Sequence, residues 1–388
     1  MNQLKRLLVN IMRGVHLGDA FGVPFEMMTR ADIHRLVGPA GVLGPRFDLD
    51  PKLRRVPDTR GLANGSTSDD SQLANAIAEA LILGDGYVHE VQVLCHLYAL
   101  WNDVAGWGGT TKLSLYEIDK WYRARADVII KPPDFKHSLK NASLWASAIE
   151  RDPAEPARWR EKSRGNGVAM KIAPYAAFLA ARGGLPFENG EALARILELG
   201  RMTHADPICA IAAYAVASVI YDLARGISAE YAYLNLRKRV TSSERALAGM
   251  HVGEDRFSSA LQTAISLTSD PEALWSFGST GNSDSLTSVP MALTIWYRHC
   301  EDSEPTAAVL EAINAGGDTD TVASMVGAMM GASSDEDDWW PSMWVSALLD
   351  RGAAAEDLGS RLHDVAVRRS SRHPDWDRHA LLARIGYL

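Results

Sequence analysis

Apolar residues recur at helical spacing through most of this chain. Leu73, Ile77 and Leu81 stand four residues apart and therefore share one face of a helix. Segments with similar spacing predict further helices at residues 91–101, 193–202, 208–223, 289–299, 321–330, 344–349 and 358–367. Alternating apolar and polar runs, which are typical of strands, are scarce. The pattern therefore predicts an all-α fold and argues against repeated strand–helix–strand units.

The loops between these helices show no sign of an interdomain linker. Turn-forming residues mark loops at residues 51–64, 131–133, 151–164 and 333–341, and the sequence has no repeat of fixed period. We therefore expect residues 1–388 to form a single compact domain. Its sequence motifs fall within residues 8–332, and residues 333–388 are expected to be a C-terminal helical extension packed on the body. Three tryptophans are expected to make that contact: Trp339, Trp340 and Trp344.

The composition is that of a globular, acidic protein. Of the 388 residues, 47% are hydrophobic and 23% are charged, and the net charge is −8. Both fractions are ordinary for a folded domain. The negative charge disfavours a general nucleic-acid or membrane-surface binder. The most apolar run, residues 208–220, is too short and too rich in alanine to span a bilayer. We expect no membrane partner and no general nucleic-acid partner.

Cysteine usage and the N-terminal residues indicate a cytoplasmic protein. Cys95, Cys209 and Cys300 are far apart and form no pair at zinc-binding spacing. Their odd number fits a reducing compartment. Basic residues near the N-terminus also interrupt the apolar stretch that a secretory signal peptide needs.

Two short acidic clusters, far apart in the sequence, look like copies of one device. The first is Ser68-Asp69-Asp70-Ser71 and the second is Asp318-Thr319-Asp320-Thr321, and an apolar, alanine-rich run follows each. Each cluster would therefore place carboxylates and hydroxyls at a helix start. If the two helix starts meet, the carboxylates share a small volume, where they repel one another or bind cations. Oxygen ligands favour Mg²⁺, Mn²⁺ or Ca²⁺, so a binuclear site for such ions explains both clusters.

Plain helix capping is the alternative for each cluster, because Ser and Asp at a helix start accept hydrogen bonds from free N–H groups. Two neighbouring features favour a metal site. The second cluster follows the glycine-rich turn at residues 314–317, where the backbone can approach closely. Glycine inside a helix costs about 1 kcal/mol relative to alanine, so a packing need is implied where small residues recur. The helix after the second cluster carries Ala323, Gly327, Ala328, Gly331 and Ala332.

Three other segments carry candidate chemistry that is weak when each is taken alone. Gly165-Asn166-Gly167 is a glycine-flanked turn entering a helix, where N–H groups suit a phosphate, although it also reads as an ordinary loop. His204 precedes a long helix, where a lone histidine is more often structural. Glu26 and Asp19 flank a glycine-rich bend, and single acids of this kind are common.

Taken together and in this order, these segments resemble the ADP-ribosylglycohydrolase family. The resemblance spans about residues 8–332. The double acidic cluster is its specific part. The other stretches are weak evidence when taken singly and strong evidence when they occur together in this order. The matching stretches are residues 14–26, 68–73, 165–174, 203–204, 288–293 and 314–321, followed by Gly327-Ala328 and Gly331-Ala332.

The resemblance implies a compact all-α domain that binds two Mg²⁺ ions, with Mn²⁺ possible. By position in the motifs, the implied metal ligands are Ser68, Asp69, Asp70, Asp318, Asp320 and Thr321. The implied ADP-ribose-binding residues are Gly165, Asn166 and Gly167, with His204 near the distal ribose or the phosphates. Glu26 would border the metals.

The implied activity is Mg²⁺-dependent hydrolysis that removes ADP-ribose from a modified protein or another conjugate. The cleaved bond would be an N- or O-glycosidic bond at C1″ of the distal ribose. Asp69 or Asp70 would act as base on the attacking water, and Glu26 would assist protonation or shape the site. The sequence leaves the acceptor open, because arginine, serine, a nucleobase or a small molecule would all fit.

The chain departs from the family pattern at four positions. Ser68 stands where the family usually has threonine, and a hydroxyl is retained. Lys171 stands where the family has arginine after Met170, which removes a bidentate donor. Ala205 stands where a proline is common. Gly106, in a loop that resembles the family's Gly-Thr-Thr loop, stands where an acid would be expected.

Three other functions are open at the level of the sequence. One is a catalytically silent ADP-ribose-binding protein, although the chain keeps all six implied ligands. Another is a structural or interaction protein of the same fold. The third is a different metal hydrolase, such as a phosphohydrolase, which would release phosphate or AMP from ADP-ribose.

Overall fold

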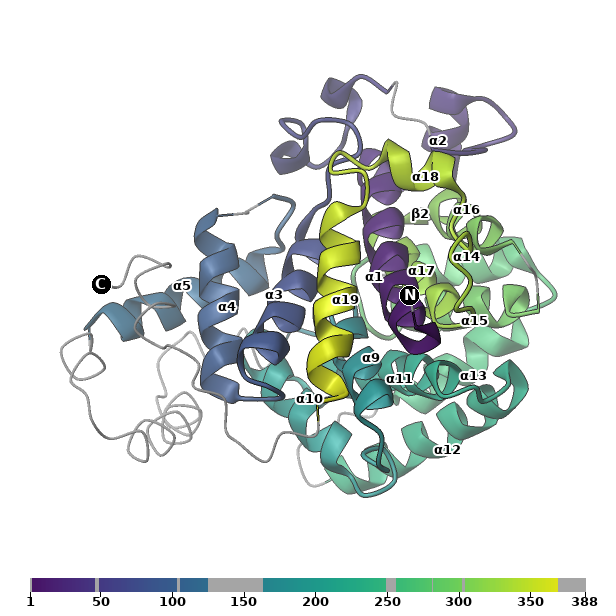
Figure 1. Cartoon of the computed structure of the whole chain (residues 1–388). Coiled ribbons are helices and arrows are strands. Elements are labelled where there is room, and N and C mark those ends of the chain that lie inside the picture. Colours follow the sequence, from purple (N-terminus) through teal and green to yellow (C-terminus); the bar gives the residue numbers. More distant parts are fainter. Residues whose placement is uncertain are drawn as a thin grey trace.

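Helices make up nearly all the regular structure in this computed structural model, which describes residues 2–45, 49–102, 105–124, 163–248, 256–280, 282–301 and 304–368 (Figure 1). The predicted all-α fold is confirmed. Within the described residues the only strands are β1 (Met28–Thr29) and β2 (Gly316–Gly317), which pair antiparallel with Met28 opposite Gly317. Short 3₁₀ turns lie at Val23–Phe25, Pro51–Leu53 and Pro57–Thr59. The helices are α1 (Gln3–Gly22), α2 (Arg30–Val37), α3 (Asp69–Leu83), α4 (His89–Asn102), α5 (Gly109–Ala124), α9 (Ala173–Arg182), α10 (Glu191–Arg201), α11 (Pro207–Ala224), α12 (Ala229–Leu247), α13 (Phe257–Ser266), α14 (Pro271–Thr280), α15 (Ser288–His299), α16 (Pro305–Ala315), α17 (Thr319–Gly331), α18 (Ser342–Ala347) and α19 (Ala353–Ala366).

The helices predicted from apolar spacing are present as α3, α4, α10, α11, α15, α17, α18 and α19. The other helices were not predicted from this spacing, whether polar, such as α12, or apolar, such as α16. In α12, for example, Ala232, Leu236 and Val240 form a buried seam at helical spacing, but charged residues interrupt it in the sequence. The predicted loop at 131–133 and nearly all of the loop at 151–164 lie outside the described residues.

The closest packing in the fold is between α1 and α17. A Cβ atom on Gly14 would lie 2.0 Å from the carbonyl oxygen of Gly327, and one on Gly18 would lie 2.1 Å from that of Ala323. Gly22, one further turn along α1, similarly faces the backbone of Asp320. The small residues of α17 therefore do admit a neighbouring backbone, as predicted, and that backbone belongs to α1.

The expected glycine-rich bend before Glu26 is wrong. Its glycines belong to one helix, α1, that continues without a break to Gly22. Gly14, Gly18 and Gly22 are spaced four apart, so all three lie on the face that meets α17. Close packing therefore offsets the low helix propensity of glycine, which costs about 1 kcal/mol per residue.

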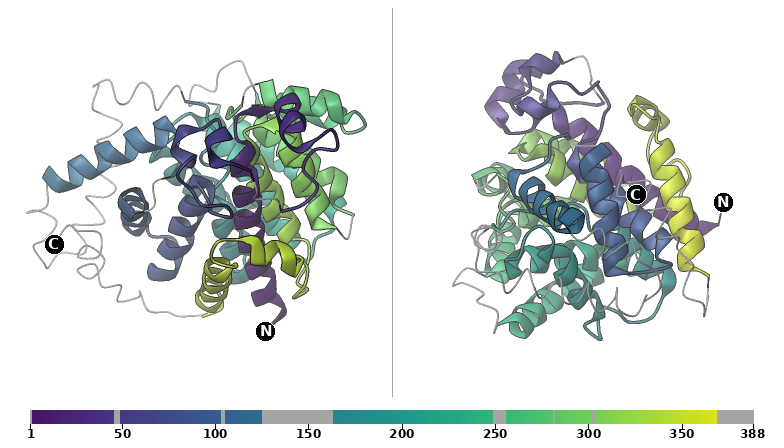
Figure 2. Two further views of the ribbon diagram at one scale, coloured as in Figure 1. Left: turned by 90° about the horizontal axis from the view of Figure 1, so that it is seen from above. Right: turned by 90° about the vertical axis from the view of Figure 1, so that its left-hand side faces the viewer.

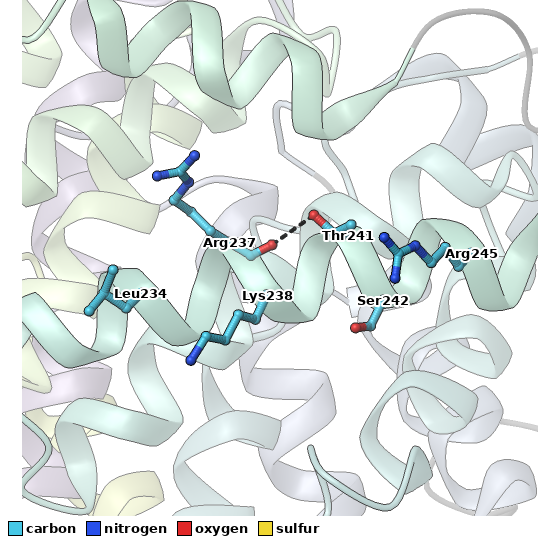
Figure 3. Close-up of a pocket in the computed structure, with 6 residues that line it drawn as sticks. All are labelled: Leu234, Arg237, Lys238, Thr241, Ser242 and Arg245. Atoms are coloured by element: carbon cyan, nitrogen blue, oxygen red, sulfur yellow. Dashed lines mark hydrogen bonds between the residues drawn. The ribbon is translucent and has the colours of Figure 1, made fainter.

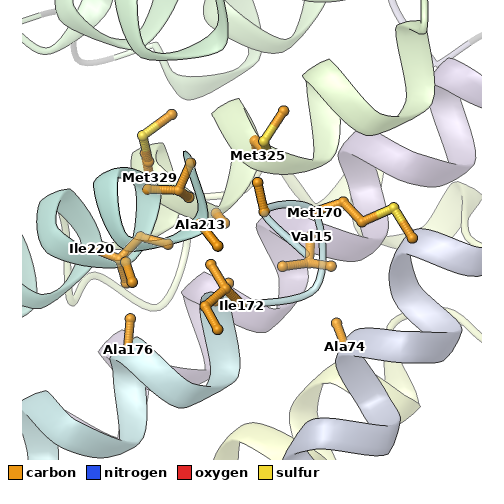
Figure 4. Packing of buried hydrophobic residues seen from close by; sticks show 14 of the residues in the cluster. Val15, Ala74, Met170, Ile172, Ala176, Ala213, Ile220, Met325 and Met329 are labelled. Carbon is orange, nitrogen blue, oxygen red and sulfur yellow. The ribbon is translucent and has the colours of Figure 1, made fainter. Parts of the chain in front are cut away.

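The hydrophobic core lies around this pair of helices. Figure 4 shows Val15 of α1 and Met325 of α17 together with Ala74 of α3 and Ala213 of α11. Among the described residues, α11 alone is long and apolar enough to cross a membrane by length and composition, with mean hydropathy 1.7. This helix is longer than the apolar run that the sequence analysis considered. However, 89% of it is buried inside the fold, as expected of a core helix.

Residues 333–368 pack against the N-terminal helix. The Trp340 indole donates to the carbonyl oxygen of Asn10 at 2.9 Å, and the Trp344 ring meets Phe21 edge-on at 4.7 Å. Arg361 of α19 makes two hydrogen bonds to Glu79 of α3, at 2.8 and 2.9 Å. Figures 1 and 2 show α19 beside α1 and α3. The division of the whole chain into domains stays a prediction.

Candidate metal and substrate site

The two acidic clusters meet at the ends of α3 and α17. Asp69 begins α3, and Asp318 directly precedes α17, so both clusters lie at helix starts as expected. The Ser68 hydroxyl oxygen lies 3.4 Å from a carboxylate oxygen of Asp320, across 252 positions of sequence. The Thr321 hydroxyl donates to Asp70 at 3.3 Å. The predicted convergence of the clusters therefore holds in the fold.

Plain helix capping does not account for these clusters. The residues at the two N-cap positions are Ser68 and Asp318, and neither side chain accepts a capping hydrogen bond from a backbone N–H of its own helix. The Ser68 hydroxyl donates instead to Asp19 at 2.6 Å. Asp320 does accept from the N–H of Thr321 at 3.0 Å, but the contact of Thr321 with Asp70 shows that these side chains also meet between the helices.

Oxygen atoms gather in two groups that share one carboxylate. One group is formed by Asp19, Asp70 and Asp320, and the other by Glu26, Asp318 and Asp320. Within each group the ligand atoms lie within 4.8 Å of one another, and all five residues are buried. Asp320 thus connects the two groups, which is an arrangement suited to a pair of cations.

Asp19 is the main residue that sequence reasoning missed. It lies on α1 and is fully buried. Its carboxylate accepts hydrogen bonds from the backbone N–H and hydroxyl of Ser68 at 2.9 and 2.6 Å, and from the N–H of Ser71 at 2.9 Å. It therefore fixes the start of α3 from another helix. The available signal was its place directly after Gly18, on the helix that packs closest to the second cluster.

The carboxylates of the site repel one another, and two of their oxygens have no compensating hydrogen bond among the described residues. Burial, the largest effect, raises the pKa of Asp19 and Asp318 and raises those of Asp69, Asp70 and Asp320 well above the usual range. Charge repulsion within the cluster adds to the rise for the last three. Among the described residues, one oxygen of Asp70 and one of Glu26 are buried without any hydrogen-bond partner. An all-oxygen set of this kind fits hard divalent cations.

Glu26 gives this electrostatic strain a measurable pH dependence. Burial, followed by repulsion from Asp318 and Asp69, raises its pKa from 4.5 to about 9. Between these values the folded, metal-free protein keeps a proton that the unfolded chain has released, so this residue makes stability fall as pH rises. In EDTA, the melting temperature of Glu26→Gln minus that of the wild type should therefore increase between pH 5 and pH 9. Thermal unfolding across this range tests it. The same change at exposed Glu336 should leave the curve parallel to the wild type, and parallel curves for Glu26→Gln would contradict the expectation.

The predicted substrate loop lies directly against the carboxylates. The Asn166 side-chain amide donates to Asp318 at 2.7 Å and to the Ser288 hydroxyl at 3.0 Å. The ring of His204 packs on the loop, because a Cβ on Gly165 would lie 2.9 Å from its Nε2 and one on Gly167 would lie 2.6 Å from its Cε1. Both glycines therefore leave the space that His204 fills. Ser288 was not predicted, since its role depends on Asn166.

One part of the loop interpretation is wrong. We expected its N–H groups to lie at a helix start, but α9 begins only at Ala173. In addition, the N–H of Asn166 is already donated to the carbonyl oxygen of Ser283 at 2.8 Å. The loop therefore presents its side chain and its glycine backbone to the site rather than a helix terminus.

Gly106 lies at the edge of the site with no room for an acid. Its φ is +75°, and a Cβ there would lie 3.1 Å from the Ser68 Cβ and 3.4 Å from an oxygen of Asp69. A side chain at this position would be strained and crowded. This chain therefore has no acid at this position, and the loop lies in close contact with the first cluster.

The side chains differ in how far they reach the surface. Asp69, Glu26, Asp318 and His204 keep 8%, 7%, 5% and 5% of their surface exposed, whereas Ser68, Asp19 and Asp70 keep none. The first four therefore keep some contact with solvent, and the last three have none.

Two surface hollows lie outside this cluster. One borders the site, because it is lined by Met27 and Gly317, the chain neighbours of Glu26 and Asp318. The other runs along α12, where Arg237, Lys238 and Arg245 project from one helix (Figure 3). None of the residues lining the α12 hollow belongs to the carboxylate cluster.

The fold and the site define an all-α protein with a buried cluster of carboxylates, and comparison with known proteins gives its family. A family model described as ADP-ribosylglycohydrolase matches residues 2–372. The chain is 28% identical over 367 residues to an uncharacterized protein of Archaeoglobus fulgidus, covering 92% of this chain and 96% of that protein. It also resembles a solved structure described as an ADP-ribosylglycohydrolase-related protein complex. The TM-score is 0.55, with 18% identity and coverage of 94% of this chain and 100% of that one, which supports the fold. The chain belongs to the ADP-ribosylglycohydrolase family.

Proposed function

We propose that this protein is a divalent-cation-dependent hydrolase that releases ADP-ribose from a modified acceptor. The bond cleaved is an N- or O-glycosidic bond at C1″ of the distal ribose. The observation that carries the proposal is the direct contact between the buried carboxylates and the glycine loop, made by Asn166 and Asp318. The buried carboxylates and the loop that the family resemblance assigns to ADP-ribose are thereby in direct contact.

The residues present fit two Mg²⁺ ions, with Mn²⁺ as an alternative. The two oxygen groups that share Asp320 would hold one cation each. Further ligands from the sequence prediction, Ser68, Asp69 and Thr321, lie in the same cluster. When bound, the cations would neutralise the carboxylates and supply Lewis acidity toward water and sugar hydroxyls.

The exposure of the carboxylates separates their roles. Asp69 is the most exposed of the aspartates in the cluster, and the N–H of Gly108 donates to its carboxylate. It is therefore our choice for the base that takes a proton from the attacking water. Asp70 is fully buried and accepts from Thr321, so it serves as a ligand and not as the base.

Glu26 and His204 also keep some contact with solvent. Glu26 has one oxygen without a partner among the described residues, and it faces the carboxylates of the second cluster. We assign it the proton donated to the leaving acceptor. Burial, followed by the charge of Lys171, lowers the pKa of His204 to about 3. A neutral imidazole at this place can donate one hydrogen bond to a ribose or phosphate oxygen.

The first test is release of free ADP-ribose from arginine-, serine- and nucleobase-linked conjugates, in Mg²⁺ and in EDTA. We expect release from at least one conjugate in Mg²⁺ and none in EDTA. Stabilisation of the fold by ADP-ribose, without release from any conjugate, would instead support a silent binding protein. Release of AMP or phosphate from ADP-ribose would support a phosphohydrolase.

A further inference from the structure

A chain of buried polar groups runs from Lys171 to His204 beneath the glycine loop. The Lys171 ammonium donates to the Thr203 hydroxyl at 3.4 Å, and that hydroxyl lies 3.0 Å from Nδ1 of His204. Lys171 and Thr203 have no exposed surface. These contacts belong to neither acidic cluster, and the proposed chemistry has so far left Lys171 without a role.

The direction of each hydrogen bond follows from its donors and acceptors. Burial lowers the pKa of Lys171 to about 7, and the charge of Asp69 opposes this shift. Below that pH the charged ammonium predominates and can only donate, so the Thr203 oxygen is then the acceptor from Lys171. The Thr203 hydroxyl has one proton, and among the described residues Nδ1 of His204 is the acceptor within reach. If Nδ1 carried a proton, the Thr203 proton would be buried without a partner, which is costly. The arrangement in which the Thr203 proton has an acceptor therefore has no proton on Nδ1 of His204 and a proton on Nε2.

The charge of Lys171 also acts on a second buried histidine, His96. Nδ1 of His96 lies 2.7 Å from the Gln92 carbonyl oxygen, which can only accept, so the lone pair of this ring is at Nε2. This Nε2 is buried and has no partner among the described residues. Burial and then the charge of Lys171 lower the pKa of His96 to about 3, so this ring also stays neutral. The two histidines on which the charge of Lys171 acts are therefore both neutral.

We propose that Lys171 and Thr203 act as positioning residues that fix the proton of His204 on Nε2. The Nε2 atom lies on the side of the ring next to Gly165 and Gly167, which belong to the substrate loop. His204 then presents an N–H group, and not a lone pair, to a ribose or phosphate oxygen. This inference rests on the proposed function only for the identity of that oxygen.

The tautomer can be read directly from the full-length protein in Mg²⁺. Long-range ¹H–¹⁵N correlation spectra of histidine-labelled protein separate the two neutral forms, and His204→Gln identifies the signal. We expect the Nε2–H form in the wild type and in Thr203→Ser, which keeps the hydroxyl. In Thr203→Val and Lys171→Met we expect a mixture or the Nδ1–H form. Lys171→Arg, which can still only donate, should restore the wild-type spectrum.

Binding of ADP-ribose to the same variants provides the second readout. Loss of one well-oriented hydrogen bond should weaken binding about tenfold in Thr203→Val, with Thr203→Ser within about twofold of the wild type. An Nδ1–H form in the wild type, or an unchanged tautomer in both Thr203→Val and Lys171→Met, would overturn the proposed role of Lys171 and Thr203 even if ADP-ribose binds. Failure of the wild type to bind ADP-ribose would overturn the proposed function and, with it, the hydrogen bond from His204 to a substrate oxygen.

Discussion

Asp320→Asn should lower the rate of ADP-ribose release at least about 1000-fold, which corresponds to about 4 kcal/mol of transition-state stabilisation. Asp320 is the carboxylate common to both oxygen groups, so its loss weakens both proposed cation sites at once. Asparagine keeps the size of the side chain and removes its charge. The rate would be measured on the conjugate that the wild type cleaves, over a range of Mg²⁺ concentrations.

Thermal stability provides a second test of the metal site that does not depend on enzyme activity. In EDTA, Asp320→Asn should melt at or above the temperature of the wild type, because one of several repelling carboxylates is gone. Mg²⁺ should then stabilise the wild type and not the variant. The matched control is Asp338→Asn, an exposed acid for which neither effect is expected. Wild-type activity or wild-type stabilisation by Mg²⁺ in Asp320→Asn would contradict the metal site.

Gly18→Ala should destabilise the fold by about 3 kcal/mol or more, at the upper end of what overpacking usually costs. The added methyl group would lie 2.1 Å from the carbonyl oxygen of Ala323 and 2.4 Å from the N–H nitrogen of Ser324. Both are backbone atoms of a buried helix, so neither can move aside alone. Urea denaturation of the metal-free protein would measure the loss in the free energy of unfolding.

Gly61→Ala is the control for this change. No atom lies within 4 Å of a Cβ at Gly61, and its φ is not in the left-handed region, so stability should hardly change. Gly18 also directly precedes Asp19, and a forced separation of α1 from α17 would move Asp19 away from Asp320. Gly18→Ala should therefore lose Mg²⁺-dependent stabilisation as well as stability. Equal stability of Gly18→Ala and the wild type would mean that the two backbones are not in contact.

Sequence reasoning succeeded where the signal was local. An acidic pair followed by an apolar run marks a helix start regardless of what surrounds it, so Asp69 and Asp318 were found together with their helices. Small residues after the second cluster indicated a close neighbour, although not which one. Glu26 and Asn166 were only weak candidates by themselves and gained specific roles from the family resemblance, because each is a single residue in an unremarkable turn.

The missed features are long-range ones. Asp19 acts on the start of another helix, and its neighbouring glycines suggested a bend because glycine has low helix propensity. Their packing against α17, which no local pattern describes, reverses that preference. Likewise, Ser288 matters through Asn166, and Lys171 matters through Thr203.

The pairing of α1 with α17 also sets the order of events during synthesis. The hydroxyl of Thr319 donates to the carbonyl oxygen of Gly22 across 297 positions, so α1 leaves the ribosome long before its partner is made. Until then the glycine face of α1 has nothing to pack against, and Asp19 has no Asp320 beside it. Because a domain folds as a unit, the centre of this fold can be completed only after α17 has been made. Ribosome-bound chains that stop before α17 should therefore lack Mg²⁺-dependent protection from proteolysis.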